Sequence, residues 1–246
     1  SGETPLGVLV TFQDLTQLKE MEQRLKRADR LAAVGQLASG MAHEIRNPLA
    51  SISGSVQLLM EGEHVTEEDR RLMRIVVREA ERLSDLLTDF LLYARPSRPD
   101  PATVDVSMLL DELADIAATD PRFARVAIRR DYPPGVTMTV DRRQIQQALW
   151  NLAINAAEAM PEGGTLWLEA QGDAGRLAVE DSGPGVPPEL QDKLFNPFFT
   201  TKDRGTGLGL ATVHTIVTAH GGSVELRGGR QGGARFVLNL TPERRD

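Results

Sequence analysis

Apolar residues recur every three or four positions through much of the first ninety residues, a spacing that predicts long amphipathic helices. In the first helix the apolar stripe consists of Leu31, Val34, Ala38, Met41, Ile45, Leu49, Ile52, Val56 and Leu59. Residues 61–65 interrupt the pattern, and Thr66 with Asp69 resembles a capping box at the start of a second helix. The second stripe consists of Leu72, Ile75, Val76, Leu83, Leu86, Leu87 and Phe90. Two such helices joined by a short connection predict a helical hairpin.

The two apolar stripes are too wide to be buried within a single hairpin. Two hairpins packed as a four-helix bundle can bury both of them. We therefore predict a homodimer in which residues 31–95 form the dimerisation hairpin.

The segment before the hairpin carries two further patterns. Residues 7–12 are typical of a short strand. Between residues 17 and 37, apolar positions lie seven apart with charges between them, which predicts a short coiled coil. We expect this coiled coil to carry a signal into the hairpin through a change of register or rotation.

The pattern changes after the hairpin. Three prolines within residues 95–101 indicate a linker, placed at 96–101, and a domain boundary. Beyond it, helices are predicted near 107–118, 141–160 and 207–220, and strands near 125–131, 136–140, 165–171, 176–181, 222–227 and 234–240. This alternation predicts that residues 102–246 form an α/β domain with a helix layer on a mixed sheet.

Composition narrows the classes of function. The chain has 246 residues, enough for one large domain or two modest ones, and its net charge of −7 argues against a nucleic-acid partner. The lack of cysteine excludes disulfides and thiolate metal sites, and no apolar run approaches the roughly 18 residues that a membrane span needs. Since the sequence begins at Ser1, a membrane-bound parent stays open. We expect no membrane contact in this segment and a cytoplasmic location, including as the cytoplasmic portion of a membrane-anchored sensor.

His43 and Glu44 are the first candidates for chemistry. A neighbouring carboxylate can hold the proton of one imidazole nitrogen and leave the other nitrogen as a nucleophile. His43 lies off the apolar stripe, between Met41 and Ile45, so we expect it to face solvent. A zinc peptidase would need a second histidine one helical turn on, and Asn47 stands there instead. A lone His-Glu pair is more often an ordinary feature of a helix surface. Other residues must therefore show whether His43 is a nucleophile.

A second group of residues, more than a hundred positions downstream, has features of a nucleotide site. Asn151 and Asn155 share one helix face, and their amide oxygens suit Mg²⁺, which also bridges phosphates. Asp181 ends an apolar strand and is followed by Gly183 and Gly185, where the backbone can approach a ligand. The Asp181 carboxylate could accept a hydrogen bond from an exocyclic amine.

A glycine-rich segment completes this group. Lys202 supplies positive charge, and the residues that open the last predicted helix are Gly205, Thr206, Gly207, Leu208 and Gly209. Backbone amides at a helix start bind phosphates, and such a loop can act as a lid. Each motif is weak alone, whereas their order along the chain favours ATP.

In this order, the segments resemble the catalytic core of bacterial two-component sensor histidine kinases, over about residues 14–241. Residues 43–49 resemble the H box, 151–156 the N box, 181–185 the first glycine box, 195–202 the F box and 205–209 the second glycine box. The H box and residues 93–96 are similar to those of nitrogen-regulation and type IV pilus sensor kinases. Residues 7–16 resemble the last strand and exit motif of a PAS sensor domain, which makes residues 1–16 its remnant.

The resemblance implies a dimeric helical hairpin followed by a Bergerat-type ATP-binding α/β sandwich. It implies that His43 accepts the phosphoryl group, with Glu44 as its base. It also implies that Asn47 positions water for removing phosphate from a partner, a response regulator with a receiver aspartate.

For the nucleotide, the resemblance implies that Asn151 and Asn155 hold Mg²⁺ and phosphate and that Asp181 binds the adenine amine. Lys202 and residues 205–209 would close on the phosphates. Two positions depart from the family pattern: Glu158 replaces a frequent basic residue, and Ala234 replaces a threonine common near the adenine.

Two other functions share part of this pattern. An ATPase or clamp of the gyrase and mismatch-repair type shares the nucleotide fold but carries a water-activating glutamate where Asn151 stands here. A non-catalytic scaffold would lack box residues that are present in this chain. We therefore expect an ATP-dependent histidine kinase that phosphorylates His43, passes the phosphoryl group to a response regulator, and acts as a phosphatase toward that regulator.

Overall fold

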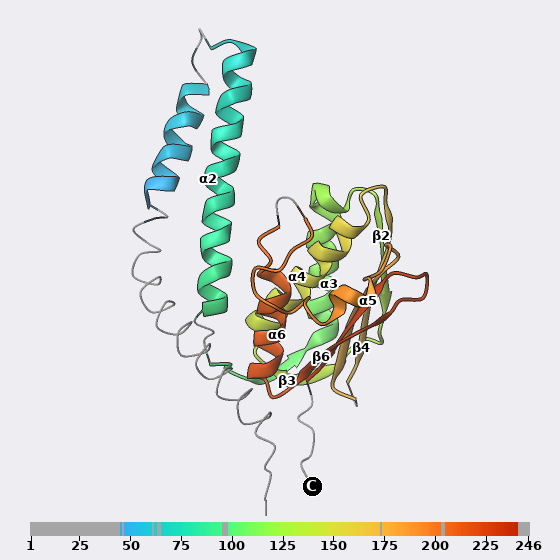
Figure 1. The fold of residues 1–246 in the computed structure, drawn as a ribbon. Coiled ribbons are helices and arrows are strands. Elements are labelled where there is room, and N and C mark those ends of the chain that lie inside the picture. Colours follow the sequence, from blue (N-terminus) through green and yellow to red (C-terminus); the bar gives the residue numbers. More distant parts are fainter. Residues whose placement is uncertain are drawn as a thin grey trace, which may run out of the picture.

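The computed structural model describes residues 45, 47–60, 62, 65–94, 98–172, 174–202 and 205–240. These residues form a helical hairpin beside an α/β unit (Figure 1). The strand predicted at 7–12, the coiled coil predicted at 17–37, and both His43 and Glu44 lie outside the described residues.

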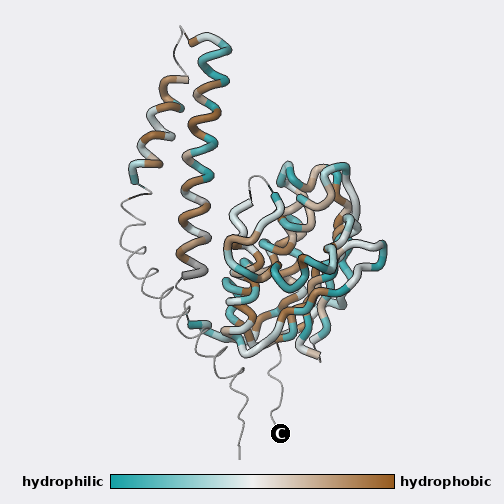
Figure 2. The backbone as a smooth tube through the Cα atoms, viewed as in Figure 1, coloured by the Kyte–Doolittle hydropathy of each residue, from teal (hydrophilic) through white to brown (hydrophobic). Residues whose placement is uncertain are grey.

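The hairpin consists of a helical segment at residues 47–60 and of α2 (Glu67–Ala94), between which the chain reverses direction (Figure 1). The predicted capping box begins α2, because the Asp69 N–H donates to Thr66 Oγ1 and the Thr66 N–H donates to the Asp69 carboxylate, both at 3.1 Å. Apolar residues recur along α2 (Figure 2). In the single chain, those that remain exposed on α2 are Leu72, Ile75, Val76 and Leu83.

The α/β unit contains all the helices and strands predicted after the linker. Its helices are α3 (Val106–Thr119), α4 (Arg142–Ala159), α5 (Pro188–Gln191) and α6 (Gly209–Ala219), with one 3₁₀ turn, η1 (Pro121–Phe123). Its strands are β1 (Ala102–Asp105), β2 (Val126–Asp131), β3 (Thr137–Val140), β4 (Gly164–Gln171), β5 (Arg176–Asp181), β6 (Ser223–Gly228) and β7 (Ala234–Asn239). The sequence pattern did not predict β1, η1 or α5, each of which is four residues or shorter.

The strands form two separate sheets. The larger has the order β2-β4-β5-β7-β6, with β2 parallel to β4 and the other neighbours antiparallel. This confirms the predicted mixed sheet. The strand predicted at 136–140 does not join it, because β3 pairs antiparallel with β1 in a two-stranded ribbon.

One face of the larger sheet is covered by α3, α4 and α6 (Figure 1). Alternate residues of the strands point into this core, and those exposed by 1% or less include Leu166, Leu168, Leu177 and Val179. They pack against Leu109 and Leu113 of α3 and against Ile145, Leu149 and Leu152 of α4. This packing fixes the rotation of α4, so its polar face is turned away from the core.

The ends of α4 and α6 are tied to each other. The Asp141 carboxylate caps α4 by accepting the N–H groups of Arg143 at 3.0 Å and Gln144 at 3.1 Å. The Asp141 N–H in turn donates to Nε2 of His220, which ends α6, at 3.0 Å. His220 Nδ1 lies 2.8 Å from the Ile216 carbonyl oxygen, so the neutral ring with its proton on Nδ1 satisfies both contacts.

The α2 helix contacts α6 and lies between the helical segment 47–60 and the α/β unit (Figure 1). Among the helices in the described part of the chain, none is both long and apolar enough to cross a membrane.

Candidate active site

A cavity of about 720 Å³ opens between α4, the turn after β5 and the segment that leads into α6. Its volume is in the range typical of small-molecule sites. The residues predicted from sequence that line it are Asn151, Asn155, Asp181, Gly185, Lys202, Gly205, Thr206, Gly207 and Gly209. Gly183 and Leu208, predicted with them, are not among the lining residues.

The polar face of α4 forms one wall of the cavity. Asn151, Asn155 and Glu158 follow at helical spacing, and all three line it. The Asn151 Nδ2 group donates to the Gly209 carbonyl oxygen at 3.3 Å, which fixes the start of α6 against α4. The side chain of Asn151 therefore has a structural contact in addition to its predicted ligand role.

The Lys202 ammonium group lies against this wall. Lys202 Nζ donates to Asn155 Oδ1 at 3.2 Å and forms an ion pair with the Glu158 carboxylate. Two oxygen-bearing side chains thus converge on one cation, and oxygen donors are those that Mg²⁺ prefers. The Asn155 amide oxygen therefore fits a magnesium ion, and Asn151 lies one turn before it on the same helix face. Among the described residues, no group of three or more His, Cys, Asp and Glu could hold a metal ion.

Asp181 lies at the opposite end of the cavity and is only 4% exposed. Its Oδ1 accepts the N–H of Gly183 at 2.8 Å and the N–H of Ala234 at 3.1 Å. Burial raises the pKa of Asp181; these two hydrogen bonds act against the rise, and the charge of Glu180 adds to it. Among the described residues no group donates to Oδ2, which leaves that oxygen as an acceptor for a ligand.

The cavity walls next to Asp181 are largely apolar. They include Ile154, which lies within the N box, and Val186, Leu190, Leu210 and Phe236, which lie outside the five boxes. A carboxylate acceptor at the end of an apolar slot suits a flat heterocycle that bears an amino group. The contact of Ala234 with Asp181 is made by the backbone N–H of Ala234 and does not involve its side chain.

The F box and the second glycine box pack directly against each other. The Phe198 N–H donates to the Gly207 carbonyl oxygen at 3.0 Å. Gly207 has φ +66°, and a Cβ atom there would lie 2.4 Å from the carbonyl carbon of Phe198. This backbone conformation excludes Gly207 from the helix, so α6 begins at Gly209 rather than at the predicted residue 207. Leu208 is 1% exposed, so its side chain belongs to the core.

The cavity has a further wall that the sequence did not predict. Arg82 and Thr88 of α2 line it. Near them, the rings of Phe90 on α2 and Phe198 lie with centroids 6.5 Å apart. Asn47, in contrast, is exposed in the helical segment 47–60 and is not a lining residue.

Two family models match the chain. Residues 33–99 match the His Kinase A (phospho-acceptor) domain, and residues 140–244 match the histidine kinase-, DNA gyrase B-, and HSP90-like ATPase. The first match contains the H box and α2, and the second contains every predicted residue of the cavity.

Curated relatives resemble the chain over most of its length. Sensor histidine kinase ZraS of Escherichia coli O157:H7 is 35% identical over 225 residues, which are 89% of this chain and 49% of ZraS. Signal transduction histidine-protein kinase AtoS of Escherichia coli strain K12 is 34% identical over 241 residues, which are 96% of this chain and 39% of AtoS. The chain therefore spans about half or less of the length of these relatives.

Solved structures agree with this likeness. Full-length ShkA in complex with AMPPNP matches with TM-score 0.68 and 30% identity, over 82% of this chain and 44% of ShkA. The catalytic domain of histidine kinase ThkA matches with TM-score 0.52 and 31% identity, over 58% of this chain and 99% of that domain. ThkA in complex with response regulator protein TrrA matches with TM-score 0.63 and 29% identity, over 95% of this chain and 70% of the ThkA chain.

Proposed function

This chain belongs to the histidine kinase family, and on that premise we propose that it uses ATP to phosphorylate its own His43. The observation that carries the proposal is one cavity in which Asn155, Asp181 and Lys202 come together from distant parts of the sequence. AMPPNP, an ATP analogue, is bound to the related ShkA. The wall that bears Asp181 suits the adenine, and the wall that bears Lys202 suits the phosphates.

In the proposed complex, Asp181 Oδ2 accepts a hydrogen bond from the adenine amino group, and the apolar wall packs on the ring. The phosphates extend toward Lys202 and residues 205–209, where backbone N–H groups at the start of α6 can donate to them. Gly183 contributes by orienting Asp181 rather than by lining the cavity.

Magnesium would be held by Asn155, with Asn151 beside it on the same face of α4. When bound, Mg²⁺ would neutralise part of the negative charge of the phosphates. For this, Lys202 must leave its contact with Asn155, and the same movement would make its ammonium group available to the terminal phosphate. The Asn151 contact with Gly209 would hold the phosphate-binding backbone next to the metal ligands.

The proposed reaction forms one bond and breaks one. Nε2 of His43 attacks the γ-phosphorus, the bond from that phosphorus to the bridging oxygen breaks, and ADP departs with the electron pair. Glu44 accepts the proton of Nδ1 as positive charge develops on the ring. Phosphoryl transfer depends mainly on positioning and charge stabilisation, which a movable nucleotide domain can provide.

The phosphoryl group would then pass to an aspartate of a response regulator. The related ThkA was solved with the response regulator TrrA, which supports a partner of this class. We also propose phosphatase activity toward that partner. Asn47 is exposed in the helical segment 47–60, one turn after His43 in sequence, where its amide could orient a water molecule.

The proposed organisation follows the sequence. Residues 1–16 would be the PAS-like remnant, 17–37 the signalling coiled coil, 31–95 the phosphotransfer hairpin, 96–101 the linker and 102–246 the ATP-binding domain. Exposed Leu72, Ile75, Val76 and Leu83 on α2 support a homodimer of hairpins. We propose a cytoplasmic location for this segment, including as part of a membrane-anchored parent.

We also propose a subgroup of sensor kinases for this chain. The wording of residues 43–49 and 93–96 favours kinship with nitrogen-regulation and type IV pilus sensor kinases. The similar curated proteins include ZraS, AtoS and sporulation kinases of Bacillus subtilis. Phosphotransfer from the labelled protein to a panel of purified receiver domains would test the partner.

Incubation with γ-labelled ATP and magnesium tests the kinase activity. We expect an acid-labile label on the wild type, none on His43→Gln, and little on Asp181→Asn. A label on His43→Gln equal to that of the wild type would refute His43 as the acceptor. Steady phosphate release without any phosphoenzyme would favour the gyrase-like ATPase instead.

A further inference from the structure

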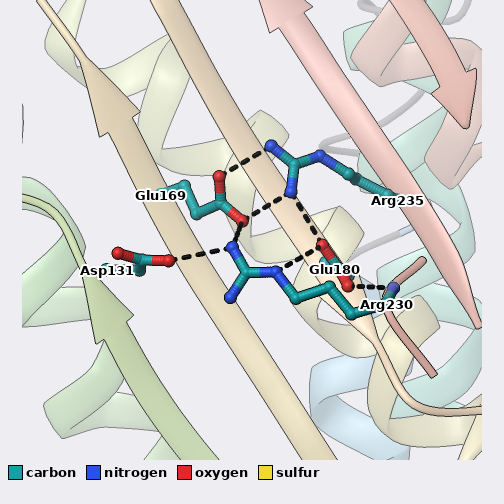
Figure 3. A network of polar contacts seen from close by, with 5 residues as sticks. All are labelled: Asp131, Glu169, Glu180, Arg230 and Arg235. Carbon is teal, nitrogen blue, oxygen red and sulfur yellow. Dashed lines mark hydrogen bonds and ion pairs between the residues drawn. The ribbon is translucent and has the colours of Figure 1, made fainter.

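The face of the larger sheet opposite the helices carries a network of five charged residues (Figure 3). They are Asp131 of β2, Glu169 of β4, Glu180 of β5, Arg230 of the β6–β7 loop and Arg235 of β7. Two of the carboxylates are buried, since Glu180 is 0% exposed and Glu169 is 7% exposed. Buried carboxylates require partners, and the two arginines supply them in different ways.

Arg235 forms ion pairs with both buried carboxylates, as Arg230 does at 2.6 Å to Glu169 and 3.6 Å to Glu180. Arg235 donates from Nη1 and Nη2 to Glu169, both at 2.6 Å, and from Nη1 to Glu180 at 2.8 Å. Its side chain lies on the strand next to β5, so these contacts stay within the sheet. Arg235 can therefore compensate the charges of Glu169 and Glu180 within the sheet when the Arg230 side chain is removed.

Arg230 connects a loop to the sheet instead. It belongs to residues 229–233, which join β6 to β7. Its Nη2 donates to Asp131 at 2.8 Å and to Glu169 at 2.6 Å, and its backbone N–H donates to Glu180 at 2.5 Å. The guanidinium group also lies 5.8 Å from the centre of the Trp167 ring. One side chain thus reaches from the loop across β5 and β4 to β2 (Figure 3).

The same loop touches the cavity end that bears Asp181. The Ala234 N–H, directly after the loop, donates to Asp181 Oδ1 at 3.1 Å. A Cβ atom on Gly233 would lie 2.0 Å from the Asp181 carbonyl oxygen, and one on Gly185 would lie 2.6 Å from the Gly232 carbonyl oxygen. The loop backbone is therefore pressed against both Asp181 and Gly185, with no space for a side chain between them.

We propose that Arg230 is a positioning residue for the adenine end of the cavity. By binding Asp131 and Glu169 it holds residues 229–233 down on the sheet, and the loop backbone then holds Asp181 with Oδ2 turned toward the base. The inference rests on the proposed function, because it assumes that Asp181 binds adenine. The charged network on the outer face of the sheet would thus contribute to nucleotide recognition in the cavity, through the loop of residues 229–233.

Arg230→Ala tests the proposal, because it keeps the backbone N–H to Glu180 and leaves Arg235 on both buried carboxylates. We expect the KM for ATP in autophosphorylation to rise about tenfold while kcat stays within about twofold. The KM for GTP, which lacks the adenine amino group, should change less. Arg230→Lys retains one cation for Asp131 or Glu169 and should recover part of the loss.

Arg227→Ala is the matched control. Arg227 lies on β6 of the same hairpin, opposite Arg235. Its guanidinium group pairs with Glu225, with Nε at 3.0 Å, rather than with Asp131, Glu169 or Glu180. Its KM for ATP should equal that of the wild type. Amide exchange provides an independent measurement: the Ala234 N–H should exchange faster in Arg230→Ala and remain unchanged in Arg227→Ala.

Asp181→Asn separates this inference from the proposed function. Asp181→Asn could raise the KM for ATP while Arg230→Ala has the same KM as Arg227→Ala. In that case the positioning role of Arg230 is overturned and the adenine role of Asp181 stands. A raised KM in Arg230→Ala without faster exchange of the Ala234 amide would equally overturn it. If Asp181→Asn keeps the wild-type KM, the adenine role of Asp181 itself fails.

Discussion

Phe90 of α2 and Phe198 of the F box face each other with ring centroids 6.5 Å apart and ring planes inclined by 31°. Phe198 is held at φ +64°, the only non-glycine positive φ among the described residues, and it is 59% exposed. A bulky residue in this conformation is strained, and the conformation persists only where surrounding contacts hold it. The contact links the hairpin to the nucleotide domain through a residue next to the cavity.

Phe90→Ala should speed autophosphorylation. In the structure α2 stands between the α/β unit and the helical segment 47–60, which follows His43 in the sequence (Figure 1). An aromatic pair contributes about 0.5–1.5 kcal/mol. Its loss should therefore raise the fraction of molecules in which the α/β unit has separated from α2, and with it the rate of autophosphorylation, by roughly two- to tenfold. Single-turnover phosphorylation measures the effect. Ile116→Ala removes an exposed apolar side chain of α3 and should leave the rate unchanged; a slower Phe90→Ala would contradict the prediction.

The pair formed by Lys202 and Glu158 should compete with the nucleotide. Lys202 cannot bind phosphate while its ammonium group is held by Asn155 and Glu158. Glu158→Gln removes the ion pair and a negative charge near the phosphates, so we expect the KM for ATP to fall about two- to threefold, whereas Lys202→Ala should raise it about tenfold. Both side chains are some two-fifths exposed, at 40% and 43%, so the unfolding midpoint should hardly change. A higher KM in Glu158→Gln would show that this carboxylate assists binding instead.

The contact between His220 and Asp141 should stabilise the α/β unit. His220→Ala leaves the N–H of Asp141 without its acceptor at the start of α4, which should cost about 1–3 kcal/mol of unfolding free energy. His220→Gln offers an amide oxygen and should recover part of this. Urea unfolding followed by tryptophan fluorescence is suitable, because both tryptophans of the chain, Trp150 and Trp167, lie in the α/β unit. Equal midpoints for His220→Ala and the wild type would contradict the assigned role.

Local patterns predicted several of the residues that line the cavity. The helical spacing of Asn151 and Asn155 and the position of Asp181 after an apolar strand are properties of a few neighbouring residues, and the fold preserves them. The capping box at Thr66 and Asp69 is equally local. Such features follow from periodicity and backbone chemistry alone.

Contacts between distant residues could not be predicted in this way. Lys202 and Glu158 are 44 positions apart, and Arg230 reaches Asp131 across 99 positions. Glu180 lies on the face of β5 opposite Leu177 and Val179, yet it is 0% exposed because Arg230 and Arg235 pair with it. The pairing of β3 with β1 depends on a strand of four residues whose pattern is too short to recognise.

Asp181→Asn should stabilise the fold at neutral pH while it weakens ATP binding. Burial raises the pKa of Asp181 in the folded state, so the folded protein binds this proton more tightly than the unfolded chain does. The resulting stabilisation is complete below the unfolded pKa of about 3.9 and is lost as pH rises through the folded pKa, so at pH 7 the ionised carboxylate lowers the unfolding free energy. Asparagine keeps an oxygen for the N–H groups of Gly183 and Ala234 without the charge.

Thermal unfolding of Asp181→Asn and the wild type between pH 3 and pH 8 tests this prediction. The variant should have the higher Tm at pH 7, and the difference should shrink as the pH falls toward 4. Asp120→Asn is the control of opposite sign, because the hydrogen bond from Arg122 lowers the pKa of Asp120, so its ionised form favours the fold at neutral pH. A lower Tm for Asp181→Asn than for the wild type at pH 7 would contradict the prediction. It would mean that the surroundings of the ionised Asp181 carboxylate stabilise the fold, so that keeping this carboxylate for ligand binding has no cost in stability.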